Sequence, residues 1–96
     1  MVKTETYEEK LDLIVSDRLK YLRNESNLTP KDVSDVLGCT QAWYDQYESA
    51  SKSISMSEVI KLAKLYRVST DFILGFTDDR DILFWWFIDS FNAIIT

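Results

Sequence analysis

The residue types that carry most enzyme chemistry are scarce in this chain of 96 residues. It contains one cysteine, Cys39, and no histidine, so neither an intrachain disulfide nor a zinc site of cysteine and histidine can form. Acid–base chemistry that depends on histidine is excluded for the same reason. Three carboxylates stand close together at Asp78, Asp79 and Asp81; they could bind a cation, but they fit better as caps on the positive end of a helix. The sequence therefore predicts that the protein is not an enzyme and needs no metal or cofactor.

Other polar residues mark the starts of helices. Hydroxyl residues precede stretches with apolar residues at helical spacing, as helix N-caps do. They are Thr6, Thr29, Thr40, Ser55, Ser69 and Thr77. Gly38 and Gly75 follow apolar stretches, where glycine commonly ends a helix in the left-handed conformation. The pattern predicts an all-α fold with helices over about 6–25, 29–37, 40–49, 55–66 and 69–74, and a sixth that begins within 77–81.

The segment from Leu28 to Glu48 predicts two helices joined by a tight turn at Gly38. Two helices that cross steeply at such a turn need a small side chain where they touch, and Ser34 is placed to be that side chain. Apolar residues on both arms would hold the helices together: Val33, Leu37, Cys39, Tyr44 and Tyr47. This geometry projects the second helix outward, where it fits a DNA major groove about 12 Å wide.

The ordered series of motifs resembles the phage-repressor-like (XRE/Cro-type) helix-turn-helix family over about residues 14–76, two thirds of the chain. The matching pieces are Ile14 with Arg18-Leu19-Lys20-Tyr21-Leu22-Arg23, Leu28-Thr29, Leu37-Gly38-Cys39-Thr40-Gln41-Ala42-Trp43, Tyr47-Glu48, the run from Leu62 to Asp71, and Leu74-Gly75. The resemblance implies a five-helix bundle whose third helix reads DNA. Residues 1–13 would then extend the first helix, and residues 77–96 would form an added C-terminal aromatic helix.

The resemblance places the base-reading positions at Thr40, Gln41, Ala42, Trp43 and Asp45. Gln41 is the strongest candidate because an amide can bond bidentately to adenine, although a merely solvated glutamine fits the same pattern. Trp43 could pack on a thymine methyl group, fold back on the following loop, or meet a protein partner. Phosphate contacts would come from flanking residues, namely Lys31, Lys52, Ser53 and Ser55.

In proteins that this chain resembles, an arginine of the first helix pairs with the glutamate that ends the third; here these would be Arg18 and Glu48. We expect this pair to fix geometry rather than to bind a ligand. The reading helix departs from the family pattern because no lysine or arginine lies between Thr40 and Ser49, and a carboxylate near phosphates lowers affinity. Pro30 stands where the family usually has glutamine, which predicts weaker or altered DNA binding.

The formal net charge of −5 is concentrated at the C-terminal end. Residues 77–96 carry one basic and four acidic groups, a net −3 of the −5, so a surface on the preceding residues can still be locally positive. The apolar run 82–88 is far shorter than the roughly 20 residues that span a bilayer. A helix that is apolar on more than one face must be buried on more than one face. We expect a two-fold dimer interface at Trp85, Trp86, Phe87, Phe91, Ile94 and Ile95, with a tail packed inside one subunit as the alternative.

The sequence thus predicts a dimeric, sequence-specific transcriptional regulator, a repressor, that binds near-palindromic double-stranded DNA. No membrane or small-molecule partner is evident, and residues 1–10 lack the apolar centre of a signal peptide, so we expect a cytoplasmic protein. A helix-turn-helix module that binds another protein is the alternative. The acidic reading helix, Trp43 and Pro30 favour that alternative.

Overall fold

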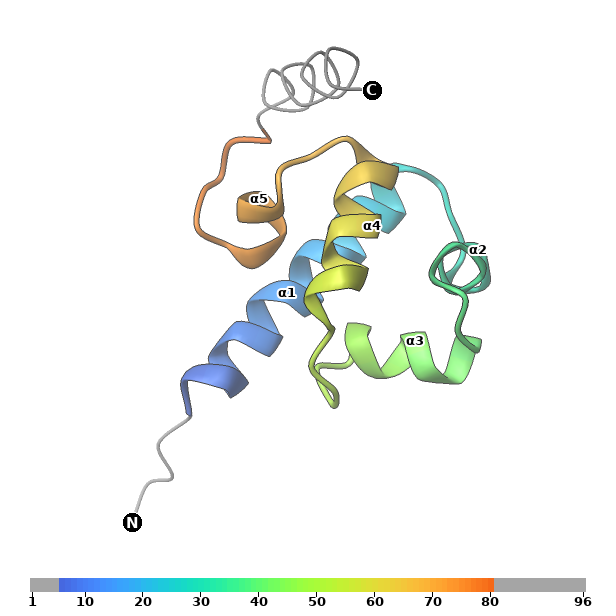
Figure 1. Cartoon of the computed structure of the whole chain (residues 1–96), viewed down its shortest axis with the longest axis horizontal. Coiled ribbons are helices and arrows are strands. Elements are labelled where there is room, and N and C mark those ends of the chain that lie inside the picture. The colour runs from blue at the N-terminus through green and yellow to red at the C-terminus, as the bar shows by residue number, and fades with distance from the viewer. Residues whose placement is uncertain (1–5, 81–96) are drawn as a thin grey trace.

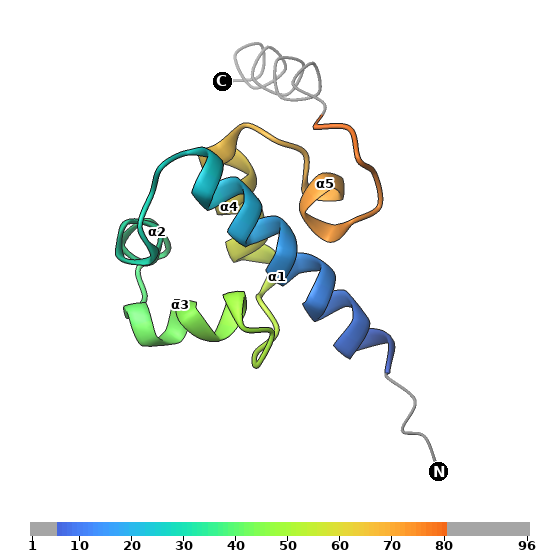
Figure 2. The same ribbon diagram turned by 180° about the vertical axis from the view of Figure 1, so that it is seen from behind.

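A computed structural model describes residues 6–80 of the chain. This part contains five α-helices and no strand: α1 (Tyr7–Glu25), α2 (Pro30–Leu37), α3 (Gln41–Glu48), α4 (Met56–Tyr66) and α5 (Thr70–Leu74). The long helix α1 contacts α3 and α5, while α2 contacts α3 and α4, and α4 contacts α5. Figures 1 and 2 show α1 running diagonally through the bundle, with α2 and α3 at one side of it and α5 at the other. The predicted all-α architecture with an extended first helix is confirmed.

Each helix begins at a predicted hydroxyl cap, whose side chain accepts a hydrogen bond from the backbone N–H three residues later. These caps are Thr6, Thr29, Thr40, Ser55 and Ser69. Gly38 and Gly75 end α2 and α5 in the left-handed conformation, with φ of 74° and 79°. The start of α2 has one hydrogen bond beyond the predicted cap. The Asp32 side chain accepts from the Thr29 N–H and so completes a capping box with Thr29. The hydrogen bond from the Thr29 backbone lowers the pKa of the Asp32 carboxyl.

One apolar core joins all five helices. Its members are Val15, Leu19, Leu22, Val33, Leu37, Tyr44, Tyr47, Val59, Leu62, Ala63, Tyr66, Val68, Phe72 and Ile73. The α2 and α3 residues in it recur at helical spacing, so each of these short helices presents one face to the core and one to solvent. The core therefore fixes which side of α3 can meet a partner.

Residues 77–80 leave α5 without forming a helix. The Ser69 N–H donates to the Arg80 carbonyl at 3.1 Å, and Arg80 Nη1 donates to Glu25 Oε1 at 2.6 Å, which lowers the pKa of the Glu25 carboxyl. These contacts place Arg80 beside the C-terminal end of α1. The predicted C-terminal helix, including Trp85, Trp86, Phe87, Phe91, Ile94 and Ile95, lies outside the described residues. Within residues 6–80, no helix has the length and hydrophobicity needed to cross a membrane.

Candidate nucleic-acid interface

The turn between α2 and α3 is built as the sequence predicts. Ser34 is buried where the two helices meet, and its hydroxyl donates to the Lys31 carbonyl at 2.8 Å. The Cys39 N–H donates to the Ser34 carbonyl at 3.1 Å, which closes the turn around Gly38. The Cys39 side chain packs against the core, and burial raises the pKa of its thiol. The predicted apolar contacts therefore hold α3 at a fixed angle to α2.

The face of α3 opposite the core is open to solvent. Gln41, Ala42, Trp43 and Asp45 are all exposed, as is Gln46. Thr40 is also exposed, but its hydroxyl is used as the cap that accepts the Trp43 N–H at 3.1 Å. The sequence interpretation missed Gln46, although it lies four residues after Ala42 and hence on the same face. The exposed face thus presents two amides and one carboxylate.

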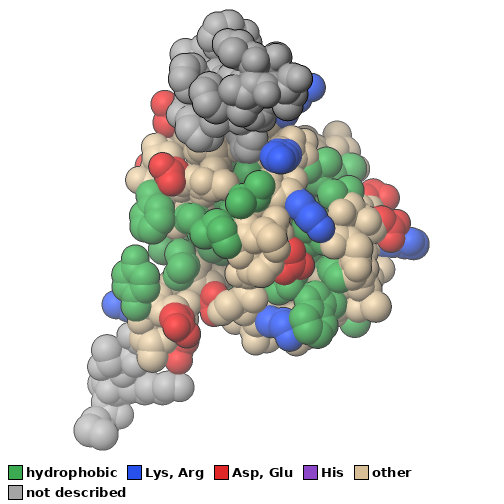
Figure 3. Space-filling model, in the orientation of Figure 1, with side chains coloured by type: hydrophobic (Ala, Val, Ile, Leu, Met, Phe, Trp, Pro, Cys, Tyr) green, Lys and Arg blue, Asp and Glu red, His purple; other side chains and the backbone are tan. Residues whose placement is uncertain are grey.

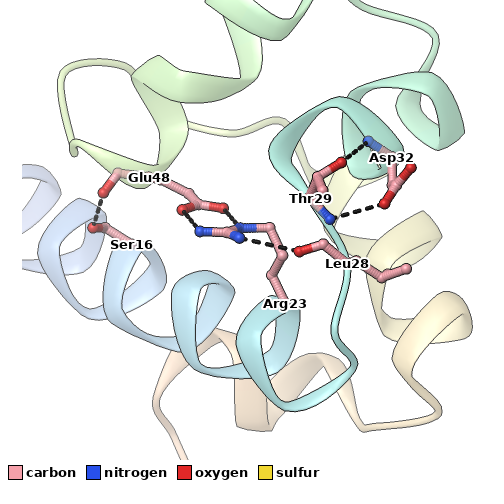
Figure 4. Close-up of polar contacts among 6 residues, drawn as sticks. All are labelled: Ser16, Arg23, Leu28, Thr29, Asp32 and Glu48. Atoms are coloured by element: carbon pink, nitrogen blue, oxygen red, sulfur yellow. Dashed lines mark hydrogen bonds and ion pairs between the residues drawn. The ribbon is translucent and has the colours of Figure 1, made fainter.

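The C-terminal end of α3 is held to α1 by Glu48. Arg23 Nε and Nη2 donate to the two carboxylate oxygens of Glu48 at 2.6 and 3.0 Å, and Arg23 Nη1 donates to the Leu28 carbonyl at 3.1 Å. The Ser16 hydroxyl donates to the Glu48 backbone carbonyl at 2.6 Å. Figure 4 shows this arrangement, in which one arginine ties α1 both to α3 and to the chain that enters α2. Hydrogen bonding to Glu48 raises the pKa of the Arg23 guanidinium.

The predicted pairing of Arg18 with Glu48 is wrong, because Arg18 lies on another side of α1. Residues seven apart share a helix face, whereas residues two apart are separated by about 200°. Ser16 and Arg23 therefore face Glu48 together, and Arg18 points elsewhere. Arg18 instead donates to Asp78 Oδ1 at 2.8 Å, and its guanidinium lies 4.3 Å from the centre of the Phe72 ring.

Trp43 folds back toward the following loop, one of the positions that the sequence left open for it. Its indole N–H donates to the Tyr47 hydroxyl at 2.6 Å, and that hydroxyl donates to Glu58 Oε1 at 2.8 Å. Lys52 lies over the indole, with Nζ 3.4 Å from the ring centre. Burial above all, and also the contact with Glu58, raises the pKa of Tyr47 to about 12. The loop after α3 thereby brings a cation to a helix that has none of its own.

The other residues predicted to contact phosphate have partners within the protein. Lys31 lies 3.1 Å from Asp35, an exposed pair one turn apart on α2. The Ser53 hydroxyl donates to Asp12 Oδ2 at 2.8 Å, while Ser55 caps α4 and its hydroxyl also donates to Glu58. Exposed pairs of this kind are weak and can exchange for a phosphate. Their roles toward DNA stay predictions.

Known proteins show the same pattern. A family model described as a helix-turn-helix domain matches residues 14–72. The uncharacterized HTH-type transcriptional regulator YobD of Bacillus subtilis is 41% identical over 64 residues, which cover 67% of this chain and 57% of that protein. A second B. subtilis protein, YqaE, with the same description, is 32% identical over 59 residues, or 62% of this chain and 51% of that protein. The chain thus spans little more than half the length of these relatives.

A solved structure confirms the fold. The crystal structure of a transcriptional regulator from Listeria innocua superposes with a TM-score of 0.63 and covers 82% of this chain and 76% of that one, at 20% sequence identity. At that identity the likeness concerns the fold alone. The family match, in contrast, covers α1 from Ile14 onward, the α2–α3 turn, α3, α4 and the start of α5. The chain therefore belongs to the helix-turn-helix family of DNA-binding domains, as its sequence predicts.

Proposed function

We propose that this protein is a sequence-specific DNA-binding transcriptional regulator, and that α3 is the helix that enters the major groove. The observation that carries the proposal is the exposed face of α3, where Gln41 and Gln46 stand on a helix whose other face belongs to the core. An amide can donate to and accept from the major-groove edge of adenine. The bonds from Ser16 and Arg23 to Glu48 support the proposal, since they hold α3 in one orientation.

In this proposal Lys52 has a separate role, that of a phosphate contact. It lies over Trp43, beside the exposed face rather than on it. A lysine there can neutralise one phosphate without contacting any base, so it would raise affinity for every sequence alike. Gln41 would distinguish sequences, whereas Lys52 would not.

The regulator would act as a dimer on a near-palindromic operator. Two copies related by a two-fold axis would place their α3 helices one DNA turn apart, about 34 Å. We place part of the dimer contact at Trp85, Trp86, Phe87, Phe91, Ile94 and Ile95, as the apolar pattern of that segment predicts. Repression would follow from occupying the operator and excluding the polymerase.

The proposal is tested by selecting bound sequences from a random DNA pool with the full chain, and then measuring affinity by fluorescence anisotropy over a series of salt concentrations. Gln41→Ala should reduce the preference for the selected site by about 5- to 160-fold, the range for one bidentate base contact. Lys52→Ala should weaken binding to all sequences and lower the slope of log K against log salt by about 1.

Lys20→Ala is a matched control, because Lys20 is an exposed cation on α1, outside the α3 face. It should leave both the preference and the salt slope close to those of the unmodified chain. If Gln41→Ala and Lys52→Ala weaken binding equally on every sequence, α3 does not read bases and the proposal fails.

A protein-binding helix-turn-helix is the second candidate function, and one observation favours it. The exposed face of α3 carries Asp45 and, among residues 41–48, no lysine or arginine, a charge distribution that suits a basic protein surface better than phosphates. A gel shift against random DNA at low salt distinguishes the two functions, since a DNA reader retains non-specific binding there. Complete absence of a shift would favour the protein-binding function.

A further inference from the structure

A face of the molecule away from α3 exposes apolar side chains, of which only Leu11 is partly buried and also packs against the core. Figure 3 shows hydrophobic side chains gathered at the left of the view, over α1, α4 and α5. We name this surface the α1–α4–α5 patch and define it by Tyr7, Leu11, Ile14, Met56, Ile60 and Phe76. Scattered exposed apolar residues are ordinary on proteins, whereas a continuous apolar surface marks an interaction site.

The continuity of the patch follows from its spacing and contacts. Tyr7, Leu11 and Ile14 are four and three residues apart, so they form one stripe on α1, beside the stripe that begins at Val15 and faces the core. Leu11 and Met56 line one groove of about 310 Å³ between the start of α1 and the start of α4. Ile60 is one helical turn beyond Met56 on α4.

The last residue of the patch, Phe76, follows the end of α5 and lies beside α1. The Ile14 side chain occupies the position that a side chain at Gly75 would need, so the chain after α5 passes directly over α1 at this point. Phe76, the next residue, is 65% exposed. The aromatic ring therefore stands on the surface beside Ile14 rather than in the core.

The size of the patch suits a protein–protein contact. The exposed fractions are 73% for Tyr7, 65% for Phe76, 55% for Met56, 42% for Ile14 and 40% for Ile60. At about 200 Å² for a fully exposed side chain of this size, these fractions amount to roughly 550 Å². This area is near the upper end of the about 300–600 Å² of the largest patch on a typical monomer. It would form the centre of an interface of about 800 Å² per partner.

The charges at the edges of the patch indicate which partner covers it. Glu8 and Asp12 border it on the α1 side, whereas Lys64 and Arg67 follow Ile60 along α4 and are exposed. A two-fold contact brings each side of a surface against the opposite side of its copy. The acidic side of one chain would then meet the basic side of the other, so the patch is complementary to itself.

We propose that the α1–α4–α5 patch is a surface through which two copies of this chain associate. Figure 1 shows α3 at the lower right and the start of α1 at the lower left, on the other side of the view. None of the residues that define the patch belongs to α3, so a contact between two patches leaves the exposed face of α3 to another partner. The inference adds a contact on the described residues to the dimer of the proposed function. It is measured without DNA, so failure of DNA binding leaves it standing.

The test is the mass of the full chain in solution, measured by sedimentation equilibrium over a range of concentrations. The double variant Met56→Glu with Phe76→Glu places carboxylates on two of the most exposed side chains of the patch, where they do not disturb the core. Losing two anchors from the centre of an interface should raise the dimer dissociation constant by about 100-fold or more. Val36→Glu is the matched control, because Val36 is 47% exposed on α2, outside the patch, and should associate like the unmodified chain.

A second measurement needs no variant and therefore does not depend on folding of the double variant. Backbone hydrogen exchange over residues 7–14 and 56–60 should slow as the concentration of the unmodified chain rises, whereas exchange over residues 41–46 should not change. The proposal is overturned if the unmodified chain is a monomer at every concentration, or if the double variant keeps the native dissociation constant. It is also overturned if removing residues 81–96 abolishes association while the double variant has no effect, because the C-terminal segment would then be the whole interface.

Discussion

Replacing Arg23 by alanine should destabilise the fold strongly, since Glu48 would lose its ion-pair partner. The Arg23 and Glu48 side chains are only 16% and 12% exposed, so water replaces the lost partner poorly. Three hydrogen bonds disappear, two to the Glu48 carboxylate and one to the Leu28 carbonyl. The substitution thus leaves the mostly buried Glu48 carboxylate without its cation. It also leaves the Leu28 carbonyl, just before α2, without its hydrogen bond from Arg23.

The size of the effect follows from the burial. Removing one partner of a fully buried pair costs about 3–5 kcal/mol. Residual exposure of both side chains argues for the lower end, about 3 kcal/mol. For a small domain with a urea m-value of about 1–1.5 kcal/mol/M, this loss lowers the unfolding midpoint by about 2–3 M. Far-UV circular dichroism during urea titration measures the midpoint directly.

Arg18→Ala is the matched comparison because it removes the same side chain from the same helix. Its partner Asp78 is 99% exposed, and such surface pairs contribute about 0–1 kcal/mol. The contact of Arg18 with the buried ring of Phe72 contributes about 1–2 kcal/mol, so the total loss should be about 1–2 kcal/mol and smaller than that of Arg23→Ala. Equal destabilisation by the two alanine substitutions would refute the conclusion that Arg23, and not Arg18, holds α3 in place.

Two further predictions concern backbone and titration. Gly75→Ala should destabilise the fold more than Gly38→Ala in the same urea assay. Both residues have positive φ, so both substitutions strain the backbone, but an added Cβ meets a side chain of α1 only at Gly75. A loss at Gly38 well above the about 1–2 kcal/mol of a left-handed alanine would contradict this difference. Burial holds the pKa of Tyr47 and Tyr66 at about 12, above the ordinary 10.0. The unfolded chain therefore releases these protons first, and the unfolding free energy should fall as the pH rises from 10 to 12, less steeply in Tyr47→Phe.

Local signals in the sequence predict the helices well. A hydroxyl cap satisfies a backbone N–H within its own turn, so Thr6, Thr29 and Thr40 mark helix starts whatever surrounds them. Gly38 is equally local, because it alone among its neighbours adopts positive φ at little cost. The exposed side of α3 is also predictable, since burial of Tyr44 and Tyr47 leaves the other face to solvent.

Contacts between distant segments are less predictable. Whether Arg18 or Arg23 meets Glu48 depends on the rotation of α1 about its axis, and both arginines lie in the motif of the first helix. Two turns cannot be predicted from the sequence for another reason. Ala50 and Arg67 take φ of 61° and 57°, although neither residue type favours the left-handed conformation. The stack of Lys52 on Trp43 depends on the turn at Ala50 and shares its unpredictability.

The contacts of α3 bear on how it could recognise DNA. Its start is fixed by the turn at Gly38, its end by Glu48, and its middle by the hydrogen bonds from Trp43 through Tyr47 to Glu58 on α4. A helix held at three points changes its angle little on binding, so the exposed side chains would adjust to the groove rather than the helix. Preorganisation of this kind reduces the entropy lost on association. It can therefore offset part of the affinity that Asp45 costs near phosphates.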